Sequence, residues 1–227
     1  MAVDGDALRT AYQAAQYMAI SLRARAAQRE SRKRFLSLRV ERLEERFVLS
    51  NAIVAENQLP GSPESEWGVF GIGDTTLQGF ATDMSVNRGQ PISFKINDST
   101  TASYHIDIYR LGYYAGLGAR RVATIPSAQV LRQVQPAPLA NAATGLVDAG
   151  NWAVSATWSV PSTATSGLYI ARPTRDDTGG ASVIYFVVRD DSGASDLLFQ
   201  TADTTWQAYN NWGNNSLYEG PGLPDGR

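Results

Sequence analysis

The stretch Tyr-His-Ile-Asp-Ile-Tyr-Arg at residues 104–110 decides the fold class, because apolar and polar side chains alternate along it. Successive side chains of a strand point to opposite faces, so Tyr104, Ile106 and Ile108 share one face. We expect this face to lie in the core. Residues 182–189 carry apolar side chains at both odd and even positions, which predicts a strand that is covered on both faces.

Short apolar runs of the same kind recur on both sides of these two stretches, with glycine, proline, serine and threonine between them. Sustained helical periodicity is confined to the start of the chain. This spacing is typical of an all-β protein built as an antiparallel β-sandwich, which we place at residues 51–195. Further strands are expected at residues 92–97, 121–125, 152–158, 167–172 and 197–201.

Residues 1–50 differ in character from the rest of the chain. They hold most of the clustered basic side chains, and the stretch from Asp6 to Glu45 has neither proline nor glycine. This composition favours a helix, or a segment that is disordered when alone. Residues 42–50 resemble the Leu-Glu-Pro-Arg-type sorting motif of exported bacterial proteins, with Glu45 in place of its proline. A sorting segment predicts an exported protein, and the alternative is a short basic amphipathic helix.

Composition excludes several classes of function. The formal net charge of -2 gives no indication of a nucleic-acid partner. Because the chain has no cysteine, it has no disulfide, thiolate nucleophile or cysteine-ligated metal. No stretch approaches the roughly 18 apolar residues that a membrane-spanning helix requires. We therefore expect neither nucleic acid nor a membrane span.

Acid–base chemistry has few candidate residues. His105 is the only histidine, and Asp107 is the carboxylate nearest to it on the same strand face. One histidine without cysteine leaves no Ser-His-Asp or Cys-His arrangement, and Lys33 and Lys95 are the only lysines for a variant that uses lysine. We expect a structural or surface histidine, and the sequence identifies no catalytic residue.

Two kinds of loop could bind a ligand. The pairs Asp176–Asp177 and Asp190–Asp191 lie beside glycines, where aspartate side chains commonly accept hydrogen bonds from backbone N–H groups in turns. A calcium ion is the alternative for these carboxylates. The loop at residues 112–118 contains Tyr113 and Tyr114. These tyrosines either stack on a sugar or peptide partner or pack against the body of the protein.

The segment at residues 203–218 is dense in aromatic and amide side chains. It follows a short apolar run at residues 197–199, and a strand that leads into such a loop is a common start of an α/β domain. We therefore expect residues 196–227 to begin an α/β domain whose remainder this sequence lacks. Trp206, Asn210 and Trp212 are expected to face that domain or another partner.

Several longer motifs, in the right order, resemble the family of bacterial proteins related to the large (β) subunit of N,N-dimethylformamidase, specifically its N-terminal portion. The likeness runs from about residue 51 to about residue 220. It is carried by Ala55–Gly61, Gln78–Asp83, Ile106–Tyr114, Gly150–Val154, Ser166–Ala171 and Thr204–Tyr218.

The resemblance implies an immunoglobulin-like sandwich followed by an α/β domain similar to glutamine amidotransferases. Relatives hydrolyse a small amide with a single iron ion that tyrosine and glutamate side chains hold. By motif position Tyr209 would be a phenolate ligand of this iron, and the alternative is a packing residue. The other ligands would lie beyond Arg227, so we expect no cofactor and no activity in this chain alone.

Two functions are consistent with these observations. In the first, the chain is the N-terminal part of an exported amide-hydrolase-like protein, and its sandwich supports a catalytic domain that is absent here. In the second, it is a non-catalytic extracellular binding module that acts through Tyr113 and Tyr114. The substrate and the oligomeric state are left open.

Overall fold

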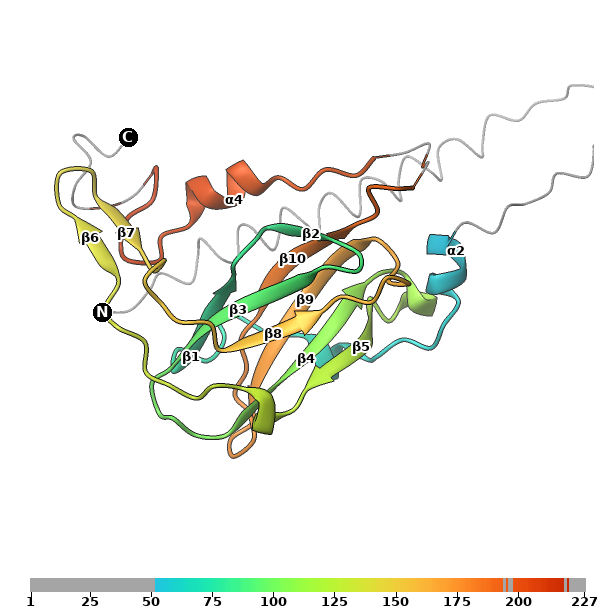
Figure 1. The fold of residues 1–227 in the computed structure, drawn as a ribbon, viewed down its shortest axis with the longest axis horizontal. Helices are drawn as coiled ribbons and strands as arrows, with labels where there is room; N and C mark the ends of the chain where they lie inside the picture. Colours follow the sequence, from blue (N-terminus) through green and yellow to red (C-terminus); the bar gives the residue numbers. More distant parts are fainter. Residues whose placement is uncertain (1–51, 194, 196–197, 219, 221–227) are drawn as a thin grey trace, which may run out of the picture. The chain divides into compact units, whose positions relative to one another are not determined.

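The computed structural model describes residues 52–193, 195, 198–218 and 220, all of which belong to one compact unit that spans Ser50–Arg227 (Figure 1). The predicted basic helix and the sorting motif at residues 1–50 lie outside the described residues. No helix within the described ranges is long and apolar enough to cross a membrane.

Strands dominate the described chain, in two main sheets and one hairpin. The larger sheet has five strands in the order β2-β10-β9-β4-β5, and the smaller has three in the order β1-β3-β8. Every pairing is antiparallel except that of β10 with β2, which is parallel. The strands are β1 (Leu77–Ala81), β2 (Ser85–Asn87), β3 (Pro91–Asp98), β4 (Tyr104–Leu111), β5 (Ala119–Ile125), β6 (Leu139–Asn141), β7 (Leu146–Asp148), β8 (Ala156–Ser159), β9 (Gly167–Arg175) and β10 (Ile184–Arg189).

Helices are short and lie at the ends of the described chain or in connections. The α-helices are α2 (Ala52–Asn57), α3 (Glu64–Trp67) and α4 (Asp203–Tyr209), and two 3₁₀ turns are η1 (Tyr114–Gly116) and η2 (Ser127–Gln129). Figure 1 shows α4 beside the β6–β7 hairpin, away from α2. An all-β fold is therefore confirmed at the level of element content.

The two main sheets share one apolar core. Ile106 and Ile108 of β4 are fully buried in it, as the alternation along residues 104–110 predicts. Phe94 of β3 and Phe186 of β10 meet across the core with their ring centroids 5.7 Å apart, in an edge-to-face arrangement that aromatic pairs favour. The apolar faces of the two sheets therefore pack against each other.

Five of the predicted strands are confirmed, as β3, β4, β5, β9 and β10. The strand expected at residues 152–158 begins only at Ala156, because Trp152 closes a turn by donating its backbone N–H to the carbonyl of Ala149. Residues 198–201 form no strand, so the strand predicted there is wrong over its described part. The sequence pattern did not predict strands β1, β2, β6 and β7.

The prediction that β10 is covered on both faces is wrong for one of them. Ile184, Phe186 and Val188 are buried in the core, but on the opposite face Tyr185 is 56% exposed. The ring of Tyr185 lies 6.2 Å from that of Trp206 in α4, so a single aromatic contact covers this face in part. The apolar side chains of residues 182–189 therefore serve the core on one face and the C-terminal segment on the other.

A buried ionic cluster ties β3 to β9. The guanidinium of Arg175 donates to a carboxylate oxygen of Asp98 at 2.9 Å, to Asp74 at 3.2 Å and to the carbonyl oxygen of Thr76 at 2.7 Å. Arg175 and Asp98 are almost completely buried. Buried charges need such partners, because each ion loses its hydration on folding. The cluster also fixes the loop that leads into β1, one wall of the pocket described below.

Candidate functional site

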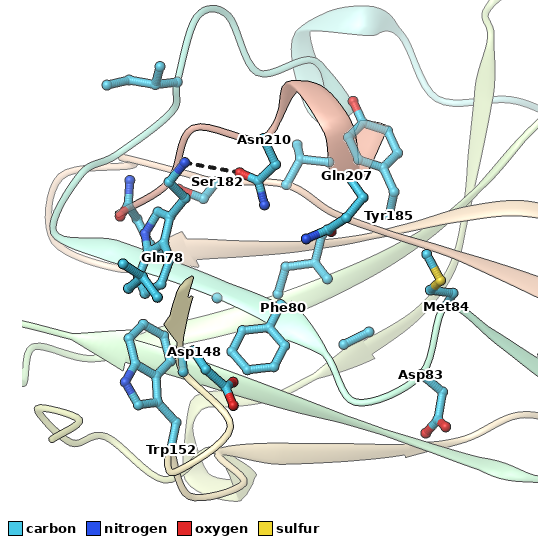
Figure 2. Close-up of a pocket in the computed structure, with 18 residues that line it drawn as sticks. Gln78, Phe80, Asp83, Met84, Asp148, Trp152, Ser182, Tyr185, Gln207 and Asn210 are labelled. Carbon is cyan, nitrogen blue, oxygen red and sulfur yellow. Dashed lines mark hydrogen bonds between the residues drawn. The ribbon is translucent and has the colours of Figure 1, made fainter. Parts of the chain in front are cut away.

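A pocket lies where the C-terminal segment at residues 203–212 meets the β-sheets (Figure 2). Its volume of about 580 Å³ lies within the range of small-molecule sites. Strand β1, the start of β10, the end of the β6–β7 hairpin and α4 each contribute side chains to it. The pocket is therefore a tertiary feature that joins four separate parts of the chain.

Aromatic side chains form the pocket's apolar wall. Phe80 of β1 and Trp152 lie with their ring centroids 5.8 Å apart, and Trp212 meets Trp152 edge-on at 5.7 Å. The indole N–H of Trp152 donates to the carbonyl oxygen of Pro136 at 3.0 Å, so this buried ring has its polar atom satisfied. The three rings thus form a pre-organised surface at the pocket.

Amide and carboxylate groups supply the polar part of the lining. The side-chain oxygen of Asn210 accepts a hydrogen bond from the backbone N–H of Trp212 at 3.1 Å. Asp148 of β7 accepts the backbone N–H of Gly150 at 2.7 Å. Gln207 of α4 also lines the pocket, and the lining includes no lysine, arginine or histidine. The polar lining is therefore neutral or acidic.

Close contacts with the β6–β7 hairpin position the C-terminal segment. The side-chain N–H₂ of Asn215 donates to the carbonyl oxygen of Gly145 at 2.8 Å. Gly213 has a φ of +86°, and a Cβ at this position would lie 2.7 Å from the side chain of Val147. Only glycine adopts such a backbone conformation without strain and permits such a close approach. Gly213 therefore lets the segment lie directly on β7.

Comparison with known families gives a match whose range includes the C-terminal segment of the pocket. A sequence model described as N,N-dimethylformamidase beta subunit-like, C-terminal, matches residues 105–227, which is more than half of the chain. The chain belongs to this family. No curated protein matches the chain. The model's description names the C-terminal part of the subunit, so the match confirms the dimethylformamidase-like family and leaves assignment to its N-terminal portion a prediction.

Iron ligation by Tyr209 is the first site prediction that the dimethylformamidase-like family raises. Tyr209 lies at the end of α4, exposed, with its ring stacked on that of Tyr218 at a centroid distance of 4.6 Å. Among the residues that the structure describes, no group of three or more His, Cys, Asp or Glu side chains could hold a metal ion. A lone phenolate does not make an iron site, so the described residues do not fit a complete one.

The aromatic residues predicted to face a partner have different surroundings. Tyr113 is 70% exposed, whereas Tyr114 is fully buried. The hydroxyl of Tyr114 donates to Glu56 at 2.8 Å and accepts a hydrogen bond from Arg110 at 3.0 Å. A partner-facing role for Tyr114 is therefore corrected, because its side chain belongs to a buried polar network. The buried environment also raises the pKa of the Tyr114 hydroxyl, chiefly by desolvation, so Tyr114 stays neutral.

Of the other predicted residues, Asn210 and Trp212 line the pocket, and Trp206 lies half exposed against Tyr185. The sequence reading did not single out Phe80, Asp148 and Trp152 as site residues. Phe80 and Trp152 lie within the motifs Gln78–Asp83 and Gly150–Val154 that carry the family resemblance, which was the available signal.

His105 and the aspartate pairs lie outside the pocket lining. The Nδ1 atom of His105 lies 2.6 Å from Asp176, and its Nε2 atom lies 3.6 Å from Asp107. Asp190 pairs with Arg88 at 3.0 Å. These side chains therefore bind one another across strands and turns, and no metal-binding cluster of three carboxylate or histidine residues occurs in the described ranges.

Low pH is expected to weaken the hydrogen bonds of the Asp176 carboxylate with Ser103 and His105. The hydroxyl of Ser103 and then His105 lower the pKa of Asp176 below its ordinary value of 3.8. A carboxyl whose pKa is lower in the folded state stabilises the fold fully above its unfolded pKa, and this stability is lost as the pH falls through the folded pKa. We expect the free energy of unfolding, measured in urea, to fall below pH 3.8. Asp176→Asn should make this fall shallower, and an unchanged profile would contradict the assignment.

Proposed function

We propose that this domain is the immunoglobulin-like, non-catalytic module of an exported amide-hydrolase-like protein, and that its C-terminal segment packs against a catalytic domain. Family membership supports the amide-hydrolase part of the proposal. Two facing sheets with a shared core support the immunoglobulin-like part. Export rests on the motif at residues 42–50 alone.

The observation that carries the proposal is the apolar exposure of residues 198–218. Leu198 is 94% exposed and Phe199 is 81% exposed, and Tyr209, Leu217 and Tyr218 are more than half exposed. These side chains are spread along the segment rather than gathered in one patch, and only Tyr209 and Tyr218 stack on each other. Large exposed apolar side chains in one segment are typical of a surface that another domain covers. A further domain of the same protein would bury them at the segment that already lines the pocket.

In this proposal Tyr209 donates its phenolate to an iron site that residues of the catalytic domain complete. Its position at the end of α4, exposed and stacked on Tyr218, leaves the ring accessible from the solvent side. An anionic oxygen donor suits a hard ferric ion, which would act as a Lewis acid on an amide carbonyl.

Comparison of the natural gene product with residues 1–227 tests the proposal. We expect the gene product to extend beyond Arg227 and to release dimethylamine from N,N-dimethylformamide, whereas residues 1–227 alone release none. Tyr209→Phe in the longer protein should lower iron content or activity by more than the roughly 10- to 100-fold that the loss of an outer-shell partner of a metal ligand costs, and Tyr218→Phe serves as the matched control. A gene product without a further domain would overturn the supporting role, and an unaffected Tyr209→Phe variant would overturn the ligand role.

The alternative function is an adhesion module that acts through the loop at residues 112–118. One of the two tyrosines that would form its contact surface is buried. Only Tyr113 presents an exposed ring there, because the Tyr114 side chain is buried beneath the loop. A single aromatic side chain gives little stacking area, so the loop is the weaker candidate.

A further inference from the structure

The charge of the pocket restricts the ligands that it can take. Asp83 and Asp148 are the charged side chains of its lining, which has no cationic residue. Within the described part of the chain, the hydrogen-bond partners of these two carboxylates are the hydroxyl of Thr82 and the backbone N–H of Gly150. Lys95, a cation that the structure places beside Phe80, lies outside the lining and donates to the carbonyl oxygen of Gly150 at 2.7 Å. Phosphates, sulfates and carboxylates would therefore meet like charge in the lining itself. The pocket is therefore unsuited to anions.

Hydrogen-bond capacity narrows the ligand class further. The side-chain oxygen of Asn210 accepts a hydrogen bond from the backbone N–H of Trp212. The other end of the amide is therefore the N–H₂ group, which is directed to the pocket and can donate to a ligand. Figure 2 shows the side-chain nitrogens of Asn210 and Gln207 directed toward the same part of the pocket. These donors require an acceptor, whereas the Asp148 carboxylate requires a donor. A hydroxyl group can both donate and accept a hydrogen bond, whereas a quaternary ammonium ion can do neither.

The aromatic wall adds a surface for the apolar face of a ring. Phe80 and Trp212 of this wall are partly exposed, and Tyr185 lines the pocket apart from them, beside α4 (Figure 2). A sugar ring presents C–H groups on its faces and hydroxyl groups around its edge, which suits an aromatic surface bordered by amides and a carboxylate. A volume of about 580 Å³ accommodates a ligand of this kind.

We propose that this pocket binds a neutral, polyhydroxylated ring ligand, that is, a sugar unit, either free or at the end of a glycan. Asn210 and Gln207 donate to its hydroxyl oxygens, Asp148 accepts from a hydroxyl, and the ring lies against the aromatic wall. This binding is separate from amide hydrolysis and requires no further domain.

Titration of residues 1–227 with sugars tests the inference directly. The probes are methyl glycosides of glucose, galactose and mannose, N-acetylglucosamine, and an array of neutral glycans, with binding followed by calorimetry and by tryptophan fluorescence. We expect saturable binding of at least one neutral sugar, and none of choline or inorganic phosphate. Binding by the methyl glycosides would indicate a free-sugar site, and binding by the array alone would indicate a glycan end. Absence of binding across both sets, or preference for choline or phosphate, would overturn the proposal.

Variants assign the binding to this pocket. Loss of one hydrogen bond in Asn210→Ala or Gln207→Ala should weaken sugar binding by about three- to tenfold. Asn210→Asp keeps the acceptor for Trp212 but removes the donor, so it should weaken sugar binding at least as much. Tyr113→Ala, at the exposed loop, is the matched control and should bind normally. Unchanged affinity in both Asn210 variants, with native circular dichroism, would overturn the site.

Discussion

Replacing Phe186 with alanine is expected to lower the free energy of unfolding by about 3–5 kcal/mol. The Phe186 side chain is almost fully buried between the two sheets. Its ring lies 5.7 Å from those of Phe94 and Tyr169 and 6.0 Å from that of Trp158, measured between centroids. Removal of the ring leaves a cavity that these rigid neighbours cannot fill, so both the transfer free energy and the packing are lost. Urea unfolding followed by tryptophan fluorescence measures the change.

Tyr185→Ala is the matched control for this prediction, because Tyr185 is the next residue along the same strand and points to the opposite face. It is more than half exposed, and its one aromatic-ring contact within the described residues is with Trp206. We expect a loss of about 1 kcal/mol or less. Equal losses for the two variants would show that β10 does not have one core face and one open face.

Arg175→Met is expected to destabilise the domain by a similar amount, about 3–5 kcal/mol. The guanidinium is the cationic partner of Asp98, which is fully buried and 2.9 Å away, and of Asp74 at 3.2 Å. Without it the Asp98 carboxylate would lie in the interior with no opposite charge, which costs more than the ion pair itself contributes. Urea unfolding at pH 7 provides the measurement.

The partly exposed pair of Arg88 with Asp190, at 3.0 Å, offers the control. Arg88→Ala should cost about 1 kcal/mol or less, because water screens the pair and solvates the carboxylate that remains. Adding Asp98→Leu to Arg175→Met should recover part of the loss, since the second change removes the uncompensated charge. Losses of equal size for Arg88→Ala and Arg175→Met would contradict the importance of the buried cluster.

Local alternation was sufficient to predict the central strands but not the flanking ones. Residues 104–110 alternate in sequence, and Tyr104, Ile106 and Ile108 lie in the main core, although Asp107 and Tyr109 on the opposite face are buried as well. Strand β1 carries Gly79, where a Cβ would lie 2.5 Å from the carbonyl oxygen of Lys95. The close approach of two backbones requires a glycine, and a glycine interrupts the apolar pattern that marks a strand. Gly79 therefore permits β1 to pair with β3 and also explains why the apolar pattern did not predict β1.

The candidate site was predictable only on its C-terminal side. The density of aromatic and amide residues at 203–218 identified Asn210 and Trp212, which line the pocket. Phe80 and Asp148 come from parts of the chain that are distant in sequence, and only tertiary packing brings them to Trp212. The burial of Tyr114 likewise depends on Glu56, far away in sequence and in a different element. Single-sequence patterns carry no record of such distant contacts.

The parallel pairing of β2 with β10 has a consequence for how the chain folds during synthesis. Ser85 lies opposite Val187, so a strand near the start of the domain finds its neighbour only near the domain's end. A nascent chain must therefore keep β2 unpaired until β10 leaves the ribosome, and contacts between residues so distant in sequence form slowly. Until then the unpaired strand edge of the growing sheet is exposed to pairing with other chains.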